Sequence, residues 1–225
     1  MLKIGHRGAK GHVAENTLES FQKALDFGVD GIELDIHRCA SGEMVVIHDE
    51  TVDRTSNGKG FVTGFSLAEL KDLKVEKNFK IPTLQEVLDI VNRNCIVNIE
   101  LKGKNTAPTT VAIIEKYIAT KQWSYDDFLV SSFDWNALLE VRSLNTKIPI
   151  GVITKTDVEH AYEFAKYNVA HSIHPFFDLL TKENTLQMQQ KGFKIFPWTV
   201  NETEAIEKMK SFKVNGIITD FPDRL

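Results

Sequence analysis

The chain has 225 residues, 42% of them hydrophobic, a length that allows a single α/β barrel with a sizeable core. Its net charge of −4 and pI near 6.0 argue against a nucleic-acid-binding protein, which usually carries a basic stripe. Cys39 and Cys95 form neither a disulfide scaffold nor a zinc motif, so we expect reduced thiols. No segment has the apolar length of a signal peptide or a transmembrane helix, which predicts a cytoplasmic protein without stable membrane insertion.

Short β-type segments alternate with amphipathic helical segments along the whole chain. The predicted strands lie at 2–5, 31–36, 44–48, 95–101, 128–133, 148–153, 170–174, 193–200 and 216–220. The predicted helices lie near 17–28, 66–73, 83–93, 107–121, 134–144, 157–167, 181–191 and 201–212. Asn16 followed by Glu19 resembles a capping box for the first helix, and Gly28 and Gly192 are expected to end two helices.

This alternation predicts a parallel sheet with helical crossovers, and the connection lengths decide how many strands enter it. Nine predicted strands are one too many for a (β/α)8 TIM barrel. About six residues, RCASGE, separate the second strand from the third, whereas a parallel crossover needs roughly a dozen. We therefore predict an α/β TIM barrel in which 44–48 is the return arm of a β-hairpin that extends the second strand. A short insertion at about 49–82 follows within a single domain, 1–225.

Charged and aromatic residues gather at the carboxyl ends of the predicted strands, which form the active-site face of such barrels. Side chains alternate along a strand with a period of two, so Glu33 and Asp35 share one face, as do Glu100 and Lys102. The residues expected at the mouth are His6, Arg7, Glu33, Asp35, His48, Glu100, Lys102 and Trp198.

Three of these residues, Glu33, Asp35 and Glu100, predict a metal site. Carboxylates that converge in a partly desolvated mouth repel one another unless they are protonated or neutralised. A hard divalent cation with oxygen ligands, Mg²⁺ or Ca²⁺ in preference to zinc, would neutralise them. The alternative is a buried salt-bridge network with basic side chains: Arg7, Arg38 and Lys102. The position of Glu100 at the end of a separate strand favours the metal.

Two histidines, His6 and His48, lie at the rim of the predicted carboxylate cluster. Two histidines on opposite sides of a phosphorus can act as general base and general acid, and Arg7 can hold phosphate oxygens through two parallel hydrogen bonds. His37 shares the parity of the acids but falls in the hairpin, which makes it a weaker candidate. His174 ends a strand and fits either the site or the core. The other histidines, His12, His160 and His171, belong to no cluster and are interpreted as ordinary hydrogen-bonded residues.

An ordered set of motifs resembles that of the glycerophosphodiester phosphodiesterases. The motifs are HRG at 6–8, ENT at 15–17, ELD at 33–35, VVIHDETVDRTSNGKG at 45–60, IPTLQEVL at 81–88, NIELK at 98–102, SSFD at 131–134, PWTVN at 197–201 and GIITDFPD at 216–223. The similarity runs nearly end to end. It implies a phosphatidylinositol-phospholipase-C-like barrel, a divalent cation, and hydrolysis of small-molecule glycerophosphodiesters to glycerol 3-phosphate and an alcohol, an activity of lipid and glycerol metabolism.

The resemblance also implies a role for each matching residue. It implies that the metal ligands are Glu33, Asp35 and Glu100. It also implies that the acid/base pair is His6 and His48. The implied contacts to the substrate are Arg7, Lys102 and Trp198. Of these, Trp198 would cover the glycerol moiety. Glu15 would orient His6 or Arg7, although an acidic residue also suits a helix N-terminus. Ala14 stands where the family usually has proline, which changes the local rigidity of a loop and not the chemistry. The insertion is shorter than in many relatives, which leaves the preferred alcohol open.

Several alternatives stay open at this point. A lysophospholipase D would use the same site with an apolar groove for the acyl chain, whose candidate residues are Phe133, Trp135, Phe176, Phe177 and Phe196. A cyclising phosphodiesterase would accumulate a cyclic product. A non-catalytic phosphodiester-binding module would bind anions without turnover. The attacking group in a hydrolase is either water or the neighbouring glycerol hydroxyl, which would give a cyclic phosphate first.

Overall fold

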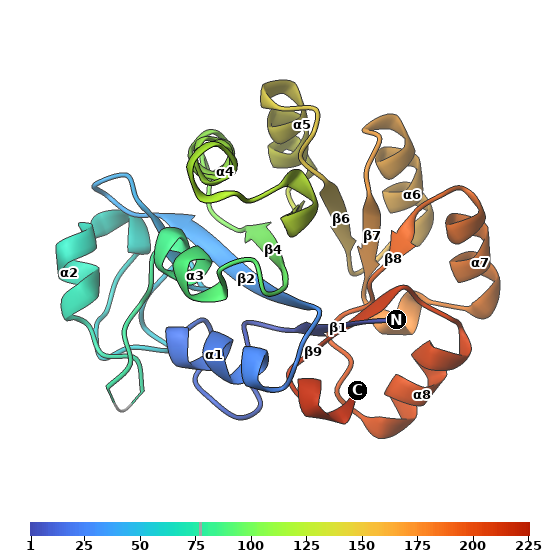
Figure 1. Cartoon of the computed structure of the whole chain (residues 1–225), viewed down its shortest axis with the longest axis horizontal. Helices are drawn as coiled ribbons and strands as arrows, with labels where there is room; N and C mark the ends of the chain where they lie inside the picture. Colours follow the sequence, from blue (N-terminus) through green and yellow to red (C-terminus); the bar gives the residue numbers. More distant parts are fainter. Residues whose placement is uncertain (77) are drawn as a thin grey trace.

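The computed structural model describes residues 1–76 and 78–225, and its central feature is a nearly closed barrel of eight parallel strands (Figure 1). These strands are β1 (Leu2–Gly5), β2 (Gly31–Arg38), β4 (Ile96–Leu101), β5 (Phe128–Ser132), β6 (Ile150–Thr154), β7 (Ser172–Pro175), β8 (Lys194–Ile195) and β9 (Gly216–Thr219). They lie in the order β8-β7-β6-β5-β4-β2-β1-β9. Backbone hydrogen bonds from Asn215 to Ile195 (3.1 Å) and from Ile218 to Pro197 (3.0 Å) join the two ends. The predicted fold class is confirmed.

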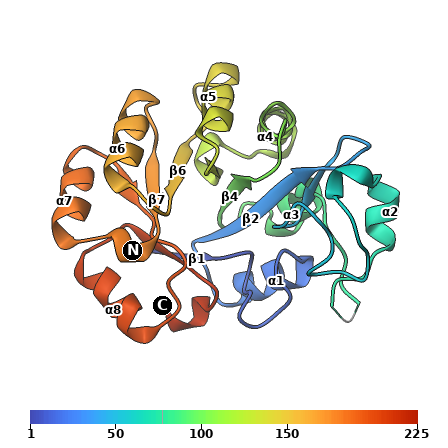
Figure 2. The ribbon, with the colours of Figure 1, turned by 180° about the vertical axis from the view of Figure 1, so that it is seen from behind.

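Helices form the outer ring of the barrel, as Figures 1 and 2 show from its two sides. They are α1 (Leu18–Asp26), α3 (Leu84–Val91), α4 (Ala107–Lys121), α5 (Trp135–Leu144), α6 (Val158–Tyr167), α7 (Lys182–Gln190) and α8 (Thr203–Ser211). Along β4, Val97, Ile99 and Leu101 lie in the main apolar core, while Asn98 and Glu100 have the opposite parity and face the barrel interior. Among helices of the described residues, none combines the length and apolarity that a bilayer crossing requires.

The hairpin and the insertion lie beside the second barrel strand. The strand β3 (Met44–Val46) runs antiparallel to β2, with Arg38 opposite Met44, which confirms the hairpin deduced from the short connection. The insertion contains η1 (Val62–Gly64) and α2 (Leu67–Asp72), and α2 lies outside the helix ring at the left of Figure 1. Val52, Val62 and Leu70 are fully buried in an apolar cluster separate from the main core. The insertion therefore has its own small core.

The start of α1 differs from its prediction. Thr17, not Asn16, caps the helix, because its hydroxyl oxygen accepts a backbone N–H of the first turn at 3.2 Å. Asn16 has a φ of 58° and donates its side-chain amide to Asp35 at 2.9 Å. The expected helix-ending glycines, Gly28 and Gly192, follow α1 and α7 with φ of 66° and 94°. The residue predicted as a cap thus holds a residue of the candidate metal site.

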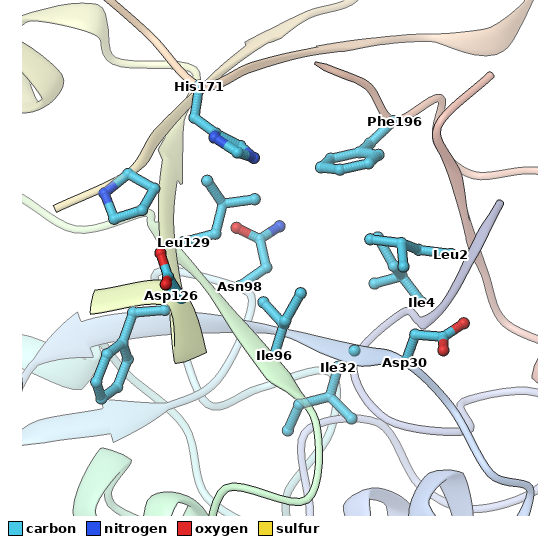
Figure 3. Close-up of a pocket in the computed structure, with 13 residues that line it drawn as sticks. Leu2, Ile4, Asp30, Ile32, Ile96, Asn98, Asp126, Leu129, His171 and Phe196 are labelled. Atoms are coloured by element: carbon cyan, nitrogen blue, oxygen red, sulfur yellow. The ribbon is translucent and has the colours of Figure 1, made fainter. Parts of the chain in front are cut away.

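The amino-terminal end of the barrel, opposite the carboxyl ends of the strands, contains an apolar cavity of about 200 Å³. Figure 3 shows Ile4, Ile96, Leu129 and Phe196 among the side chains around it. Asn98 reaches this cavity and also lines the pocket at the other end. The two ends of the barrel therefore differ in chemistry, and the charged residues of interest occupy only one of them.

Candidate active site

The carboxyl ends of the strands bring seven of the eight residues predicted at the mouth together in one pocket, and the eighth, Asp35, is buried behind its lining. Asp35 on β2 lies beside Glu100 on β4, and Glu33 lies beside Asn98, because the two strands pair in parallel register. The predicted residues that line the pocket are His6, Arg7, Glu33, His48, Glu100, Lys102 and Trp198. These residues come from positions far apart in the sequence, and the parallel barrel places them at the same edge.

The three acidic side chains form a compact cluster. Glu33, Asp35 and Glu100 are buried, with exposed fractions of 3%, 1% and 8%, and each offers an oxygen within 4.8 Å of the others. One oxygen of each, Oε1 of both glutamates and Oδ1 of Asp35, has no hydrogen-bond partner within the described part of the chain. Buried oxygens without partners are costly in an apolar interior but are the donors that Mg²⁺ and Ca²⁺ select. The residues present therefore fit a divalent cation.

Two basic side chains also contact this cluster. Arg7 Nε lies 3.2 Å from Asp35 Oδ2, and Lys102 Nζ lies 3.0 Å from Glu100 Oε1 as an ion pair without hydrogen-bond alignment. Glu33 accepts the backbone N–H of Arg7 at 3.0 Å. The salt-bridge alternative is thus partly realised through Arg7 and Lys102. At least one of the three buried negative charges is left uncompensated, because Arg7 also forms an ion pair with Glu15 at 2.8 Å.

The remaining charge is reflected in the pKa values of the acids. Burial, followed by repulsion from Asp35 and Glu100, raises the pKa of Glu33 well above its ordinary range. Burial, again followed by repulsion from Asp35, raises the pKa of Glu100 to about 7, although Lys102 opposes the shift. Without a cation, this cluster holds protons near neutral pH.

His6 is held by a carboxylate that sequence reasoning did not assign. Its Nδ1 lies 2.6 Å from Asp220 Oδ1, and its Nε2 lies 3.9 Å from Glu33 Oε2. Asn201 donates to the other oxygen of Asp220 at 2.8 Å. Burial lowers the pKa of His6 despite this partner. An Nδ1–H donated to Asp220 leaves Nε2 as the free nitrogen toward the acids.

His48, which follows strand β3, also has a carboxylate beside its Nδ1. Its Nδ1 lies 2.6 Å from Asp49 Oδ1, and Arg54 Nε donates to Asp49 Oδ2 at 2.7 Å. The Arg54 hydrogen bond lowers the pKa of Asp49 well below its usual range, so Asp49 is an acceptor. His37 Nε2 lies 3.1 Å from the carbonyl oxygen of His48, so His37 supports the backbone at His48. In both candidate histidines, Nδ1 is therefore hydrogen-bonded to a carboxylate, which leaves Nε2 free.

Glu15 contacts Arg7, one of the two residues it was expected to orient. Its Oε1 accepts from Arg7 Nη1 at 2.8 Å and from Arg54 Nη2 at 2.7 Å. Burial alone would raise the pKa of Glu15, but the hydrogen bond from Arg54 and the charge of Arg7 lower it to about 2. Glu15 is thus ionised and bridges two arginines. It lies beside the pocket and orients a residue that lines it.

Aromatic rings form one wall of the mouth around Trp198. Its indole N–H donates to the carbonyl oxygen of His174 at 2.8 Å, and Phe133 packs edge-on against it at 5.3 Å. Phe176 also contacts Trp198, at 5.7 Å between ring centroids. Two residues proposed for an acyl groove lie elsewhere. Trp135 donates its indole N–H to the carbonyl oxygen of Ile153 and packs among the outer helices. Phe196 lines the amino-terminal cavity shown in Figure 3. The five candidates do not form one groove.

His174 lies on the floor of the pocket as a neutral residue. It is 1% exposed, its Nε2 lies 2.8 Å from Ser172 Oγ, and burial lowers its pKa to about 3. The other histidines lie elsewhere. His12 pairs with Asp223 at 2.7 Å, and His171 lines the amino-terminal cavity. Only His6 and His48 of the described histidines combine an Nδ1 carboxylate partner with a place in this pocket.

A second cavity of about 560 Å³ adjoins the pocket through Lys102. Its walls come from the hairpin, the insertion and the loop after β4. Its lining includes four further charged residues: Arg38, Glu50, Lys104 and Asp134. An acyl chain would leave such groups desolvated, so this cavity is suited to a water-soluble moiety.

Comparisons with known proteins point to one family. A model of the glycerophosphoryl diester phosphodiesterase family matches residues 6–224. A glycerophosphodiester phosphodiesterase of Caldanaerobacter subterraneus subsp. tengcongensis is 39% identical over 100% of this chain and 96% of its own length. Another from Bacillus altitudinis is 36% identical, with the same coverage.

Solved structures agree with the sequence comparisons. An Oleispira antarctica phosphodiesterase in complex with the product sn-glycerol-3-phosphate superposes with a TM-score of 0.90 at 26% identity, covering 98% of this chain and 93% of that one. A glycerophosphodiester phosphodiesterase from Thermotoga maritima gives 0.85 at 29% identity, covering 99% and 96%.

Proposed function

Since the chain belongs to the glycerophosphoryl diester phosphodiesterase family and is a glycerophosphodiester phosphodiesterase, we propose that it works with one divalent cation and two-histidine acid/base catalysis. Its products are glycerol 3-phosphate and an alcohol. Residues 1–225 act as a single catalytic domain, with the insertion at about 49–82 beside the mouth. The observation that carries the proposal is the cluster of three buried carboxylates, each with an oxygen that accepts no hydrogen bond from the described residues, beside a pocket that contains His6 and His48.

The acidic side chains Glu33, Asp35 and Glu100 would hold the cation, Mg²⁺ or Ca²⁺. When bound, such a cation supplies Lewis-acid stabilisation of the charge that develops on phosphoryl oxygens. Arg7 and Lys102 would bind phosphate oxygens, since both side chains line the pocket. The buried site thus contains acidic residues for the cation and basic residues for the phosphate.

The two histidines transfer protons on either side of the phosphorus. One imidazole takes a proton from the attacking hydroxyl group through Nε2, and the other donates a proton to the departing alkoxide. Asp220 and Asp49 hold the Nδ1–H of each ring and stabilise the imidazolium that forms. Both water and the neighbouring glycerol hydroxyl are suitable attacking groups in this scheme.

The substrate is a small-molecule glycerophosphodiester. The Oleispira relative binds sn-glycerol-3-phosphate as its product, and in this chain Trp198 and Phe133 form an aromatic wall beside the phosphate-binding residues. The alcohol would leave toward the adjoining cavity, where Glu50 and Lys104 favour a soluble head group over an acyl chain. A lysophospholipase D activity is accordingly disfavoured.

A substrate panel tests this proposal. Glycerophosphocholine and glycerophosphoethanolamine are expected to be hydrolysed at least about tenfold faster, by kcat/KM, than lysophosphatidylcholine, because about 1.4 kcal/mol of unfavourable desolvation corresponds to that ratio. Phosphorus NMR during turnover, with Mg²⁺ or Ca²⁺ added, measures each rate and detects any cyclic glycerophosphate. Comparable rates on the lysophospholipid would establish the lysophospholipase D alternative. Anion binding without any turnover would establish the binding-module alternative.

The raised pKa values of Glu33 and Glu100 predict a pH effect on the metal-free protein. Between the ordinary carboxyl value of 4.5 and the value of about 7 for Glu100, the folded protein holds protons that the unfolded chain has released. The contribution of these two acids to the free energy of unfolding therefore falls as the pH rises through this window. Histidines with lowered pKa values, His6 and His174 among them, act in the opposite direction below about pH 6.5, so the wild type must be compared with Glu33→Gln. In thermal unfolding with chelator from about pH 5 to about pH 8, the unfolding temperature of Glu33→Gln should increase relative to that of the wild type as the pH rises, and millimolar Mg²⁺ should stabilise only the wild type. A difference between the two proteins that stays constant across the window would contradict the expected repulsion.

A further inference from the structure

Arg54 occupies a distinctive position, because it lies in the insertion yet contacts the partners of two pocket residues. We propose that Arg54 is a positioning residue that fixes His48 through Asp49 and Arg7 through Glu15. The insertion would thereby set the geometry of the acid/base and phosphate-binding groups. This inference rests on the proposed function, since it assumes that His48 transfers a proton and that Arg7 binds phosphate.

On one side, Arg54 holds Asp49 through both carboxylate oxygens. Nε donates to Oδ2 at 2.7 Å and Nη2 donates to Oδ1 at 3.0 Å. A bidentate pair fixes the plane of the carboxylate as well as its distance. Because Asp49 Oδ1 also lies 2.6 Å from His48 Nδ1, the fixed plane determines where the imidazole ring points.

On the other side, the same guanidinium holds Glu15. Nη2 donates to Oε1 at 2.7 Å and Nη1 donates to Oε2 at 3.1 Å. Glu15 Oε1 also accepts from Arg7 Nη1 at 2.8 Å. Charges of alternating sign therefore run from Asp49 through Arg54 and Glu15 to Arg7. The hydrogen bond between Asp49 and His48 adds the imidazole to this network, which thus connects the two pocket residues.

The geometry also distinguishes positioning from direct substrate binding. Although the Arg54 side chain is 49% exposed, its hydrogen bonds to Asp49 and Glu15 occupy four of the five guanidinium N–H donors. The donor set is thus committed to two carboxylates, so a phosphate would have to compete with both. Lysine at this position could not reproduce two bidentate contacts.

The backbone around Arg54 is fixed by the core of the insertion. Val52 is fully buried in the apolar cluster of the insertion, and its backbone N–H donates to Gly60 at 3.0 Å. Ser56 donates both its backbone N–H and its hydroxyl to the carbonyl oxygen of Val52, at 3.1 and 2.7 Å. These contacts lie on either side of Arg54 and hold the turn that carries it. The insertion core thus determines where the guanidinium lies.

The variant Arg54→Met tests the proposal. We expect kcat on glycerophosphocholine to fall by about 10- to 100-fold, the size typical of losing a residue that orients a functional histidine, with a smaller rise in KM. Nitrogen NMR of the His48 ring should change from one dominated by the Nδ1–H tautomer to a mixture of tautomers. Arg54→Lys, which keeps the charge but not the bidentate contacts, should recover only part of both effects.

Arg142→Met serves as the matched control. Arg142 donates four hydrogen bonds to backbone carbonyl oxygens, at Thr146, Ile148, Asn168 and Val169, and lies outside the pocket. Its loss should lower the unfolding temperature without changing kcat or the His48 tautomer. If Arg54→Met behaves in the same way, with wild-type kcat and tautomer, its role is only structural and the inference is wrong. His48→Ala separates the two hypotheses, because an active His48→Ala would overturn the proposed function itself.

Discussion

Replacing His48 with alanine is expected to lower kcat on glycerophosphocholine by about 10²- to 10⁴-fold, the usual contribution of a general acid or base. His48 lines the pocket, and its Nδ1 partner Asp49 leaves Nε2 available for proton transfer. His6→Ala should have an effect of the same size, because His6 has the equivalent arrangement with Asp220. Steady-state kinetics at saturating cation measures both losses.

Stability measurements are needed to interpret these variants. His48 is partly exposed, so His48→Ala should stay folded. His6 is buried and hydrogen-bonded to Asp220, so its replacement by alanine could also destabilise the fold. The variant His6→Gln keeps more of the packing and separates the two effects. His160→Ala, at an exposed histidine outside the pocket, is the control and should keep wild-type kcat. Unfolding of all the variants at His6 and His48, or wild-type turnover by either histidine variant, would show that these residues are structural.

The second large effect concerns the cation. Chelation is expected to lower turnover by about a thousandfold, since a Lewis acid contributes several kcal/mol to stabilising the transition state and each ~1.4 kcal/mol is a factor of ten. Glu33→Gln should cause a similar loss that added Mg²⁺ or Ca²⁺ does not restore. Glu33 is the acid whose side chain lacks a lysine or arginine partner in the described part of the chain, so its carboxylate relies most on a cation.

The same variant has an opposite expected effect on stability. Removing one of three mutually repelling carboxylates should raise the unfolding temperature of the metal-free protein at neutral pH by about 2–4 °C, the change that 1 kcal/mol produces in a chain of this size. Calorimetry in chelator measures this, with Glu19→Gln, a substitution on the exposed face of α1, as the control. A clear loss of stability in Glu33→Gln would mean that Glu33 belongs to a structural ion-pair network.

The main features of the fold were predictable because they depend on local patterns. Alternation with a period of two along 31–36 and 95–101 separated the core-facing residues from the acids, and the six-residue connection before Met44 excluded a parallel crossover. Strand β8 was predicted too long, at 193–200, but ends at Ile195. Pro197 has no N–H to donate, which interrupts the ladder. Pairing still continues beyond it, since Trp198 forms an isolated parallel bridge with Phe176 and its N–H donates to Pro175 at 3.2 Å.

The supporting residues of the site could not be predicted in the same way. Asp220 meets His6 across 214 positions of sequence, and Arg54 meets Glu15 across 39. No periodicity relates such pairs, because barrel closure and the fold of the insertion bring them together. Asn16 illustrates the same limit, since its sequence neighbours favoured a helix cap whereas its actual partner is Asp35 on the adjacent strand. The roles of the pocket residues came from their chemistry and from the family resemblance.

The most direct test of the central claim is a crystal structure with Mn²⁺, an oxygen-preferring substitute for Mg²⁺ whose anomalous scattering locates it. We expect one anomalous peak within about 2.0–2.6 Å of oxygens from Glu33, Asp35 and Glu100, beside the pocket that contains His6 and His48. The contradicting result is a pocket without a peak at saturating Mn²⁺, in which the three acids are fully paired with basic side chains.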